Sequence, residues 1–234
     1  MFWTSFKTRL ASLFSFNSGG RGLNRALATG LGFVVIIVMI LGFYWSTEPA
    51  PFSVQQAAEE RLAEIGNANV VGGTTTVTLI KVAQTLLEKP GGYLSNDALP
   101  PGFYLDNIPN WEFGVLVQVR DLSRAFRESF SRSQSQSTED PDLIIAEPNF
   151  HFNNDSWLCP PTESEYSEAI ASLESYLSRI SDPANAEAQF YARADNLVDW
   201  LLAVESRLGS MSQRLSASVR AQRVNTDMAG ELGA

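Results

Sequence analysis

The chain has 234 residues and a formal net charge of −9 at pH 7. Its first 45 residues contain four bases and no acid, so the remainder carries 13 bases and 26 acids. This acidic remainder argues against nucleic acid as a partner, because phosphates are bound by clustered Lys and Arg side chains. The lone cysteine, Cys159, excludes an internal disulfide.

An uncharged apolar segment covers residues 27–45. As a helix it would be roughly 28 Å long, close to the hydrocarbon thickness of a bilayer. It ends in Phe43, Tyr44 and Trp45, and aromatic residues suit a membrane interface better than a signal-peptide cleavage site. We therefore expect an uncleaved transmembrane signal anchor over residues 27–47.

The charge distribution predicts the topology. Residues 1–26 form a basic tail, with Lys7, Arg9, Arg21 and Arg25. Because cationic flanks stay inside, this tail should be cytoplasmic and residues 48–234 periplasmic, in a bacterial inner membrane. Apolar residues at helical spacing within residues 1–16 fit a helix lying on the inner leaflet, and a disordered basic tail is the alternative.

After a Pro-containing linker at residues 48–54, residues 55–234 are expected to form a mostly helical periplasmic domain. Residues 54–65 are good helix formers, and helical spacing of apolar residues continues over residues 75–88, although β-branched residues leave a strand possible at 74–77. Residues 90–110 follow with four Pro, three Gly and three aromatic residues, which predicts a long packed loop.

Asn110 is a candidate cap for the next helix. The expected core stripe of this helix is Trp111, Val115, Val119, Leu122, Phe126 and Phe130. Residues 131–142 are polar and turn-rich, which predicts an exposed loop, and residues 143–146 are expected to be a short strand or extended run.

Two further helices are predicted. Thr162 and Glu165 match a capping box, followed by the stripe Tyr166, Ile170, Leu173, Leu177 and Ile180. Asp182-Pro183 should begin the next helix, whose stripe is Phe190, Ala194, Leu197, Leu201, Val204 and Leu208. The tight connection between these stripes predicts an antiparallel helical hairpin.

Several longer phrases resemble a known family. They include GGYLSND (91–97), LDNIPNWEFGVLVQVRD (105–121), FSRSQSQSTEDPDL (130–143) and RLGSMSQRLSASV (207–219). They are similar to a proteobacterial family of inner-membrane-anchored proteins, domain of unknown function family 2333. The resemblance implies a bacterial inner-membrane protein and supplies no activity. It also implies relatives that extend further, so we expect a C-terminally shortened form.

Few catalytic arrangements fit the sequence. With one histidine, His151, a histidine metal cluster is excluded within one chain, and no phosphate or dinucleotide loop occurs, so we expect no cofactor and no metal. A carboxylate pair acting on a glycan remains, with candidates in or beside the aromatic loop: Asp97, Asp106 and Glu112.

A ligand site is a second possibility. Arginines along residues 120–132 could hold an anion, although such residues more often solvate a helix face. The candidate ligand or partner residues are Arg120, Arg124, Arg127, Tyr93, Tyr104 and Trp111. A ligand held between this face and the aromatic loop would make the protein a periplasmic sensor or binding module.

We expect an all-α, single-pass membrane protein that acts as a structural or interaction component of the bacterial cell envelope. Its partners would be the lipid bilayer and an envelope protein or a second copy of itself. The sequence favours this non-enzymatic role over two alternatives, a cell-wall glycan-acting enzyme and a sensor for an anionic or glycan ligand.

Overall fold

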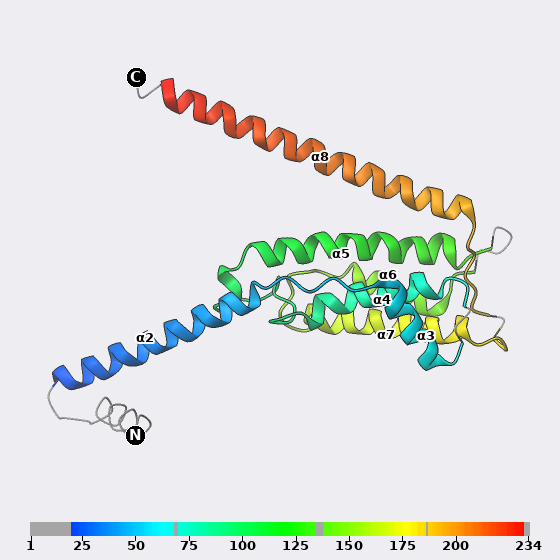
Figure 1. The fold of residues 1–234 in the computed structure, drawn as a ribbon, viewed down its shortest axis with the longest axis horizontal. Helices are drawn as coiled ribbons and strands as arrows, with labels where there is room; N and C mark the ends of the chain where they lie inside the picture. The colour runs from blue at the N-terminus through cyan, green and yellow to red at the C-terminus, as the bar shows by residue number, and fades with distance from the viewer. Residues whose placement is uncertain (1–19, 68–69, 134–137, 186, 232–234) are drawn as a thin grey trace. The chain divides into compact units, whose positions relative to one another are not determined.

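A computed structural model of the chain describes residues 20–67, 70–133, 138–185 and 187–231 (Figure 1). These residues form helices and no strand, so the predicted all-α class is confirmed. The predicted amphipathic helix over residues 1–16 lies outside the described residues. The elements, in chain order, are α2 (Gly20–Trp45), α3 (Val54–Ile65), α4 (Gly73–Glu88), the short 3₁₀ helix η1 (Gly102–Tyr104), α5 (Asn107–Ala125), the π-helical segment η2 (Phe126–Phe130), α6 (Pro141–Phe150), α7 (Thr162–Ser181) and α8 (Ala194–Glu231).

The apolar segment is helical, as predicted. The part of α2 from Arg25 to Trp45 is long and apolar enough to cross a membrane, by length and composition. Large apolar side chains are exposed along it, including Leu31, Phe33 and Ile40. A helix on the surface of a soluble core would bury such residues on one face, whereas a membrane span can expose them all round to lipid.

The chain divides into two compact units. Among the described positions, unit 1 comprises residues 20–51, 84–115 and 153–163, and unit 2 comprises residues 52–83, 116–152 and 164–231. Neither unit is continuous in sequence, and α4, α5 and α7 each contribute residues to both.

Unit 1 is built around the loop between α4 and α5. The Tyr93 hydroxyl donates to the Asn154 carbonyl at 3.0 Å, and the Asn96 amide donates to the Ser156 carbonyl at 2.9 Å. These bonds join the loop to residues 153–163. Tyr93 and Leu94 are buried, so the loop is packed down, as its aromatic residues predict.

Unit 2 has an aromatic core. Phe126 is fully buried, and its ring lies 5.8 Å from that of Phe130, 5.4 Å from that of Phe190 and 6.3 Å from that of Tyr176. Burial raises the pKa of Tyr176, whose hydroxyl donates to the Gln189 carbonyl at 2.8 Å. The segment that connects α7 to α8 therefore packs through Phe190 rather than forming helix.

Local chemistry explains two of the predicted helices. The Ser53 hydroxyl accepts from the Gln56 amide at the start of α3, and Gly66 ends this helix with a φ of +85°, a conformation that glycine adopts without strain. α4 is helical through the β-branched run at 74–77, so the strand alternative is wrong; the hydroxyls of Thr76 and Thr78 donate to the carbonyls four residues earlier.

Three boundaries differ from prediction. α5 begins at Asn107, and Asn110 lies inside it, where its side chain donates to the Asp106 carbonyl at 2.8 Å. Residues 143–146 are helical, because Asp140 caps α6 and Pro141 occupies its first turn. Residues 182–193 are not α-helical in the described part of the segment, so Asp182-Pro183 does not begin a helix.

The core face of α5 also differs from the predicted stripe. Trp111, Val115 and Leu122 are only half-buried, whereas Leu116 is fully buried. The buried positions recur at four, three, four, three and four residues and continue into η2: Glu112, Leu116, Val119, Ser123, Phe126 and Phe130. The prediction missed this face because it contains two polar residues.

Replacing Phe126 by Ala should lower the free energy of unfolding by about 3–5 kcal/mol, because the cavity would lie among three other rings. Denaturant unfolding of the full chain in mild detergent, followed by far-UV circular dichroism, measures this change. The matched control is Phe113→Ala, since Phe113 is 48% exposed; its cost should stay below about 1 kcal/mol. Equal costs for the two variants would contradict the assignment of Phe126 to the core.

Candidate functional site

Unit 1 contains a fully buried ion pair between Lys89 and Glu112. Both side chains have 0% relative exposure. Lys89 follows directly after α4, and Glu112 lies in the second turn of α5. Burying two charges costs several kcal/mol each unless they are paired and hydrogen-bonded. The carboxylate oxygens of Glu112 and the ammonium of Lys89 therefore need further hydrogen-bond partners.

The loop supplies those partners. Oε1 of Glu112 accepts from the Leu94 amide at 2.8 Å, and Oε2 accepts from the Ser95 amide at 2.8 Å and from the Ser95 hydroxyl. The Lys89 ammonium also donates to the Gly92 carbonyl. Both carboxylate oxygens of Glu112 are therefore occupied, and the pair fastens residues 89–95 to α5.

Asp97, a predicted catalytic candidate, lies beside this pair. Burial, and then the negative charges of Glu163 and Glu112, raise the pKa of the Asp97 carboxyl above its ordinary 3.8. Glu163 was not predicted; its carboxylate accepts from the Asn96 amide at 2.8 Å. The structure thus brings Asp97 and Glu112 into one acidic cluster with Glu163, next to Lys89.

The third candidate, Asp106, is exposed at the start of α5. Its backbone carbonyl accepts from both the amide and the side chain of Asn110. A hydrolase of the predicted kind needs one protonated and one ionised carboxyl group facing a substrate. Burial raises the pKa of Asp97, which is the direction that a general acid needs, but both carboxylate oxygens of Glu112 already have partners inside the protein.

The arginines of α5 and η2, and Arg132 just after η2, contact other groups of unit 2. Arg120 donates from Nε to the Phe150 carbonyl at 2.6 Å and from Nη2 to the Phe152 carbonyl at 2.8 Å. Arg127 donates to Glu139 at 3.1 Å and to Glu147 at 2.6 Å. Arg124 lies 3.6 Å from Glu147, and Arg132 lies 3.7 Å from Glu139.

These contacts define what an anion would have to displace. Arg120 covers the carbonyl of Phe150, the last residue of α6, and that of Phe152 just beyond it; a helix leaves its last carbonyls without partners of its own. Glu147, at the centre of the ion pairs, is buried and lies 3.1 Å from His151 Nδ1. A bound anion would therefore compete with carboxylates already in place.

The aromatic candidates lie in different environments. Tyr93 is buried, Trp111 is half-buried, and Tyr104 is 73% exposed.

Among the described residues no group of three or more His, Cys, Asp or Glu side chains is placed to hold a metal ion. Cys159 is an exposed free thiol.

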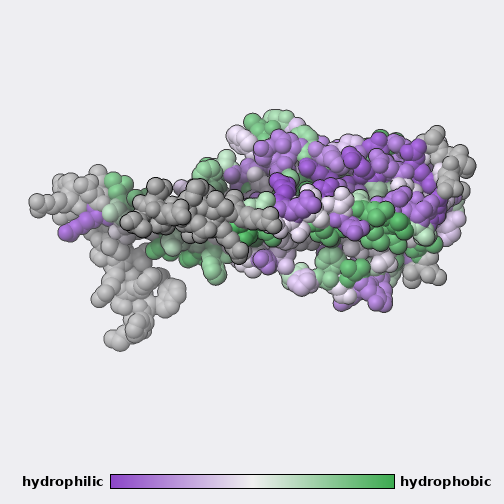
Figure 2. All heavy atoms as spheres, turned by 90° about the horizontal axis from the view of Figure 1, so that it is seen from above, coloured by the Kyte–Doolittle hydropathy of each residue, from purple (hydrophilic) through white to green (hydrophobic). Residues whose placement is uncertain are grey.

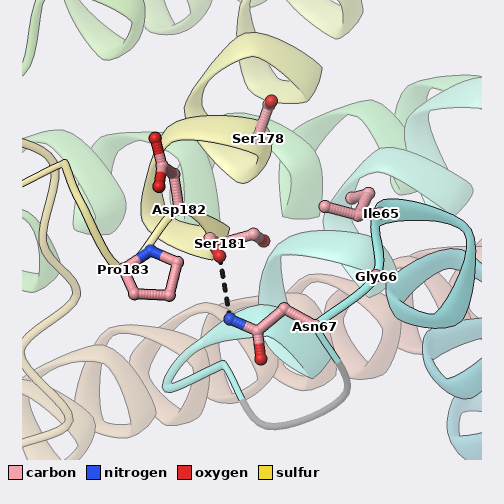
Figure 3. Close-up of a pocket in the computed structure, with 7 residues that line it drawn as sticks. All are labelled: Ile65, Gly66, Asn67, Ser178, Ser181, Asp182 and Pro183. Carbon is pink, nitrogen blue, oxygen red and sulfur yellow. Dashed lines mark hydrogen bonds between the residues drawn. The ribbon is translucent and has the colours of Figure 1, made fainter.

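A hollow in unit 2 was not predicted from the sequence. It has a volume of about 480 Å³ and lies between the end of α3 and the end of α7 (Figure 3). The Asn67 amide donates across it to the Ser181 carbonyl at 2.8 Å. Its polar lining is Asn67, Ser178, Ser181 and Asp182. A single carboxylate and two hydroxyls provide polar contacts but no nucleophile–base pair.

The features above define a class: a protein whose described residues are helical, without strands, and include one candidate membrane span. The chain belongs to a family described as uncharacterised protein conserved in bacteria (DUF2333), which matches residues 20–234. The predicted family is thereby confirmed. No curated protein and no solved structure matches the chain.

Separating the buried charges should reveal their coupling. Glu112→Gln leaves the Lys89 ammonium buried without a counter-charge and should lower the free energy of unfolding by about 3–5 kcal/mol. Adding Lys89→Met removes the stranded charge, so the double variant should be more stable than the sum of the two single changes predicts, by about 1–3 kcal/mol. Denaturant unfolding measures all three; Glu88→Gln, an exposed neighbour, is the control. Additive costs would contradict a coupled pair.

Asp97 should give a pH-dependent contribution to stability. The pKa of Asp97 in the folded state is raised above 3.8, so the folded state binds a proton more readily than the unfolded state. The free energy of unfolding therefore falls as the pH rises from about the unfolded pKa through the folded pKa. Asp97→Asn should therefore raise the thermal unfolding midpoint at pH 7, and the gain should shrink towards pH 4. Melting curves at both pH values measure this; an equal gain at both would contradict a titrating Asp97.

Proposed function

We propose that the protein is a membrane-anchored interaction component of the bacterial cell envelope, with a cytoplasmic N-terminus and residues 48–234 in the periplasm. The observation that carries this proposal is the exposed apolar face of α8. Supporting it are the candidate span α2, the basic charge before that span and the acidic charge after it.

One side of α8 contacts the rest of unit 2. Arg207 forms an ion pair with Asp121 of α5, with Nη2 2.7 Å from Oδ1. The Asn196 amide donates to the Ser129 carbonyl in η2 at 3.0 Å. These contacts hold the first half of the helix by one face.

α8 also exposes apolar residues in a regular pattern. Hydrophobic patches interrupt the hydrophilic surface seen in Figure 2. Leu201 is 50% exposed and Leu208 is 58% exposed, so the predicted hairpin stripe does not form a buried seam. Four- and three-residue spacings relate Leu197, Leu201, Val204, Leu208, Met211 and Leu215. This repeat fits packing against another helix, because the apolar residues that form the contact surface (seam) of a coiled coil recur every 3.5 residues on average.

The enzyme alternative has less support, because Glu112 is committed to an internal ion pair. The ligand-sensor alternative has less support, because Arg120 and Arg127 are paired within unit 2. A helix seam needs neither a catalytic group nor a cofactor. We therefore propose that the partner, an envelope protein or a second copy of the chain, binds to α8.

A photo-cross-linking amino acid placed at Leu208 should form a discrete adduct in intact cells, identified by mass spectrometry of the tagged full chain. The same group at Gln213, which is exposed on α8 but lies off the seam, is the matched control and should give little adduct. Adding Leu201→Glu should abolish the Leu208 adduct, because a charge in an apolar seam is strongly unfavourable. Equal labelling from both positions, or none from Leu208 at normal expression, would contradict the proposal.

A further inference from the structure

Apart from α2, unit 1 exposes a group of apolar residues that differ in kind from those on α8 of unit 2. Two short segments contribute to it: the loop around η1 and the connection before α7. Relative exposures range from 61% to 76% for Leu99, Phe103, Tyr104, Trp157 and Leu158, which we call the aromatic patch. The rings of Phe103 and Tyr104 meet edge to face, with centroids 5.5 Å apart.

Bonds within unit 1 bring the two segments together. The Asn96 amide donates to the Ser156 carbonyl, one residue before Trp157. The Asp97 side chain lies against Gly102, where an added Cβ would come within 2.3 Å of Oδ2. Gly102 directly precedes Phe103, so the hydrogen bond of Asn96 and the close packing of Asp97 each lie next to one half of the aromatic patch.

The same loop contacts the C-terminal end of α2. Trp45 covers Gly91 so closely that a Cβ there would lie 2.7 Å from Cγ of the indole. A Cβ on Gly42 would lie 3.3 Å from Cβ of Pro101, and η1 lies against α2. Figure 1 shows the end of α2 beside the segment that leads into α5.

These contacts place the loop at a particular depth relative to α2. Gly42 lies three residues inside the apolar segment from Trp45, about one turn of helix. Pro101 is therefore level with the last turn of the span rather than beyond it. Phe43 and Tyr44 in that turn are also exposed. Where α2 crosses a bilayer, its last aromatic turn lies at the interface between acyl chains and headgroups.

We propose that the aromatic patch inserts into the phospholipid interface of the leaflet in which α2 ends. The inference rests on the proposed membrane span and adds a second, non-helical contact between the protein and lipid. Trp, Tyr and Phe favour this interface, because their rings are apolar while Trp and Tyr also carry a hydrogen-bonding group. The contact would hold residues 84–115 and 153–163 of unit 1 against the membrane beside the end of α2.

The charges of unit 1 specify what kind of lipid contact this is. Among residues 84–115 and 153–163 there is one base, Lys89, which is buried with Glu112. Asp106 and Asp155 are exposed acids. Attraction to anionic headgroups needs exposed Lys or Arg side chains. The contact should therefore be apolar, should form on zwitterionic phospholipid and should persist at high salt.

A protein partner is the alternative occupant, and the pattern disfavours it. The aromatic patch comes from two irregular segments and shows no helical repeat, unlike the face of α8. Its position beside the end of α2 makes lipid the nearest apolar phase once that helix spans a bilayer. The experiment below separates the two occupants.

The single cysteine, Cys159, is exposed next to Leu158 and accepts a spin label without further mutation. The full chain is reconstituted in phosphatidylcholine vesicles, and the depth of the label is measured from collisions with oxygen and with a water-soluble nickel complex. The label should lie at the headgroup–acyl boundary, within about 5–10 Å of it, at low salt and at high salt. Phe103→Ser with Trp157→Ser should move it into water, while Leu208→Ser on α8 should not.

A second label tests the span independently. In a Cys159→Ser background, a label at Val34→Cys should lie deep in the hydrocarbon; if it does not, the proposed membrane span fails. With Val34 deep, a label at Cys159 that the nickel complex reaches freely would overturn the aromatic patch as a lipid contact. A label hidden from both nickel and lipid would also overturn it, because protein would then cover the patch. Circular dichroism confirms that each variant keeps its helices.

Discussion

The buried contact between Lys89 and Glu112 is the constraint on which unit 1 depends. Its two residues come from either end of a long loop, and the backbone between them provides the remaining hydrogen bonds. A buried ion pair contributes little net stability, because desolvation offsets most of the attraction. It does select one arrangement, since any other arrangement of the loop would leave a charge without a partner.

That selection explains how the loop can expose apolar side chains and remain ordered. An irregular segment lacks the repeating hydrogen bonds of a helix and normally needs its apolar residues for packing. Here Tyr93 and Leu94 point into the core, and Glu112 holds the backbone beside them. Leu99, Phe103 and Tyr104 are consequently left largely exposed at the surface.

Much of the helical layout could be predicted because its signals are local. The apolar run of α2, the good helix formers of α3 and the stripe of α7 each lie within one short stretch of sequence. α6 was missed because its apolar run was read without the Asp140 cap and Pro141 that begin a helix. The start of α8 was missed because Phe190, which has the spacing of a helical stripe, instead packs on Phe126 and Phe130 from a non-helical segment.

The candidate site shows the same division between local and long-range information. Asp97 and Glu112 could be chosen from the sequence because acids beside aromatic residues are visible there. Lys89 and Glu163 could not, since their roles depend on contacts across 23 residues for the ion pair and 67 residues for the bond from Asn96. No local pattern marks a lysine that will be fully buried, and the usual expectation for lysine is exposure.

The apolar surfaces left on the protein differ in a way that assigns them different environments. α2 exposes aliphatic residues around its whole circumference, which suits a bulk apolar solvent such as lipid chains. α8 exposes a periodic aliphatic stripe, which suits the grooves of another helix. The aromatic patch is irregular, rich in rings and adjacent to the end of α2, which suits the mixed chemistry of a membrane interface. These differences support our proposals that α2 and the aromatic patch contact lipid and that α8 contacts a protein partner.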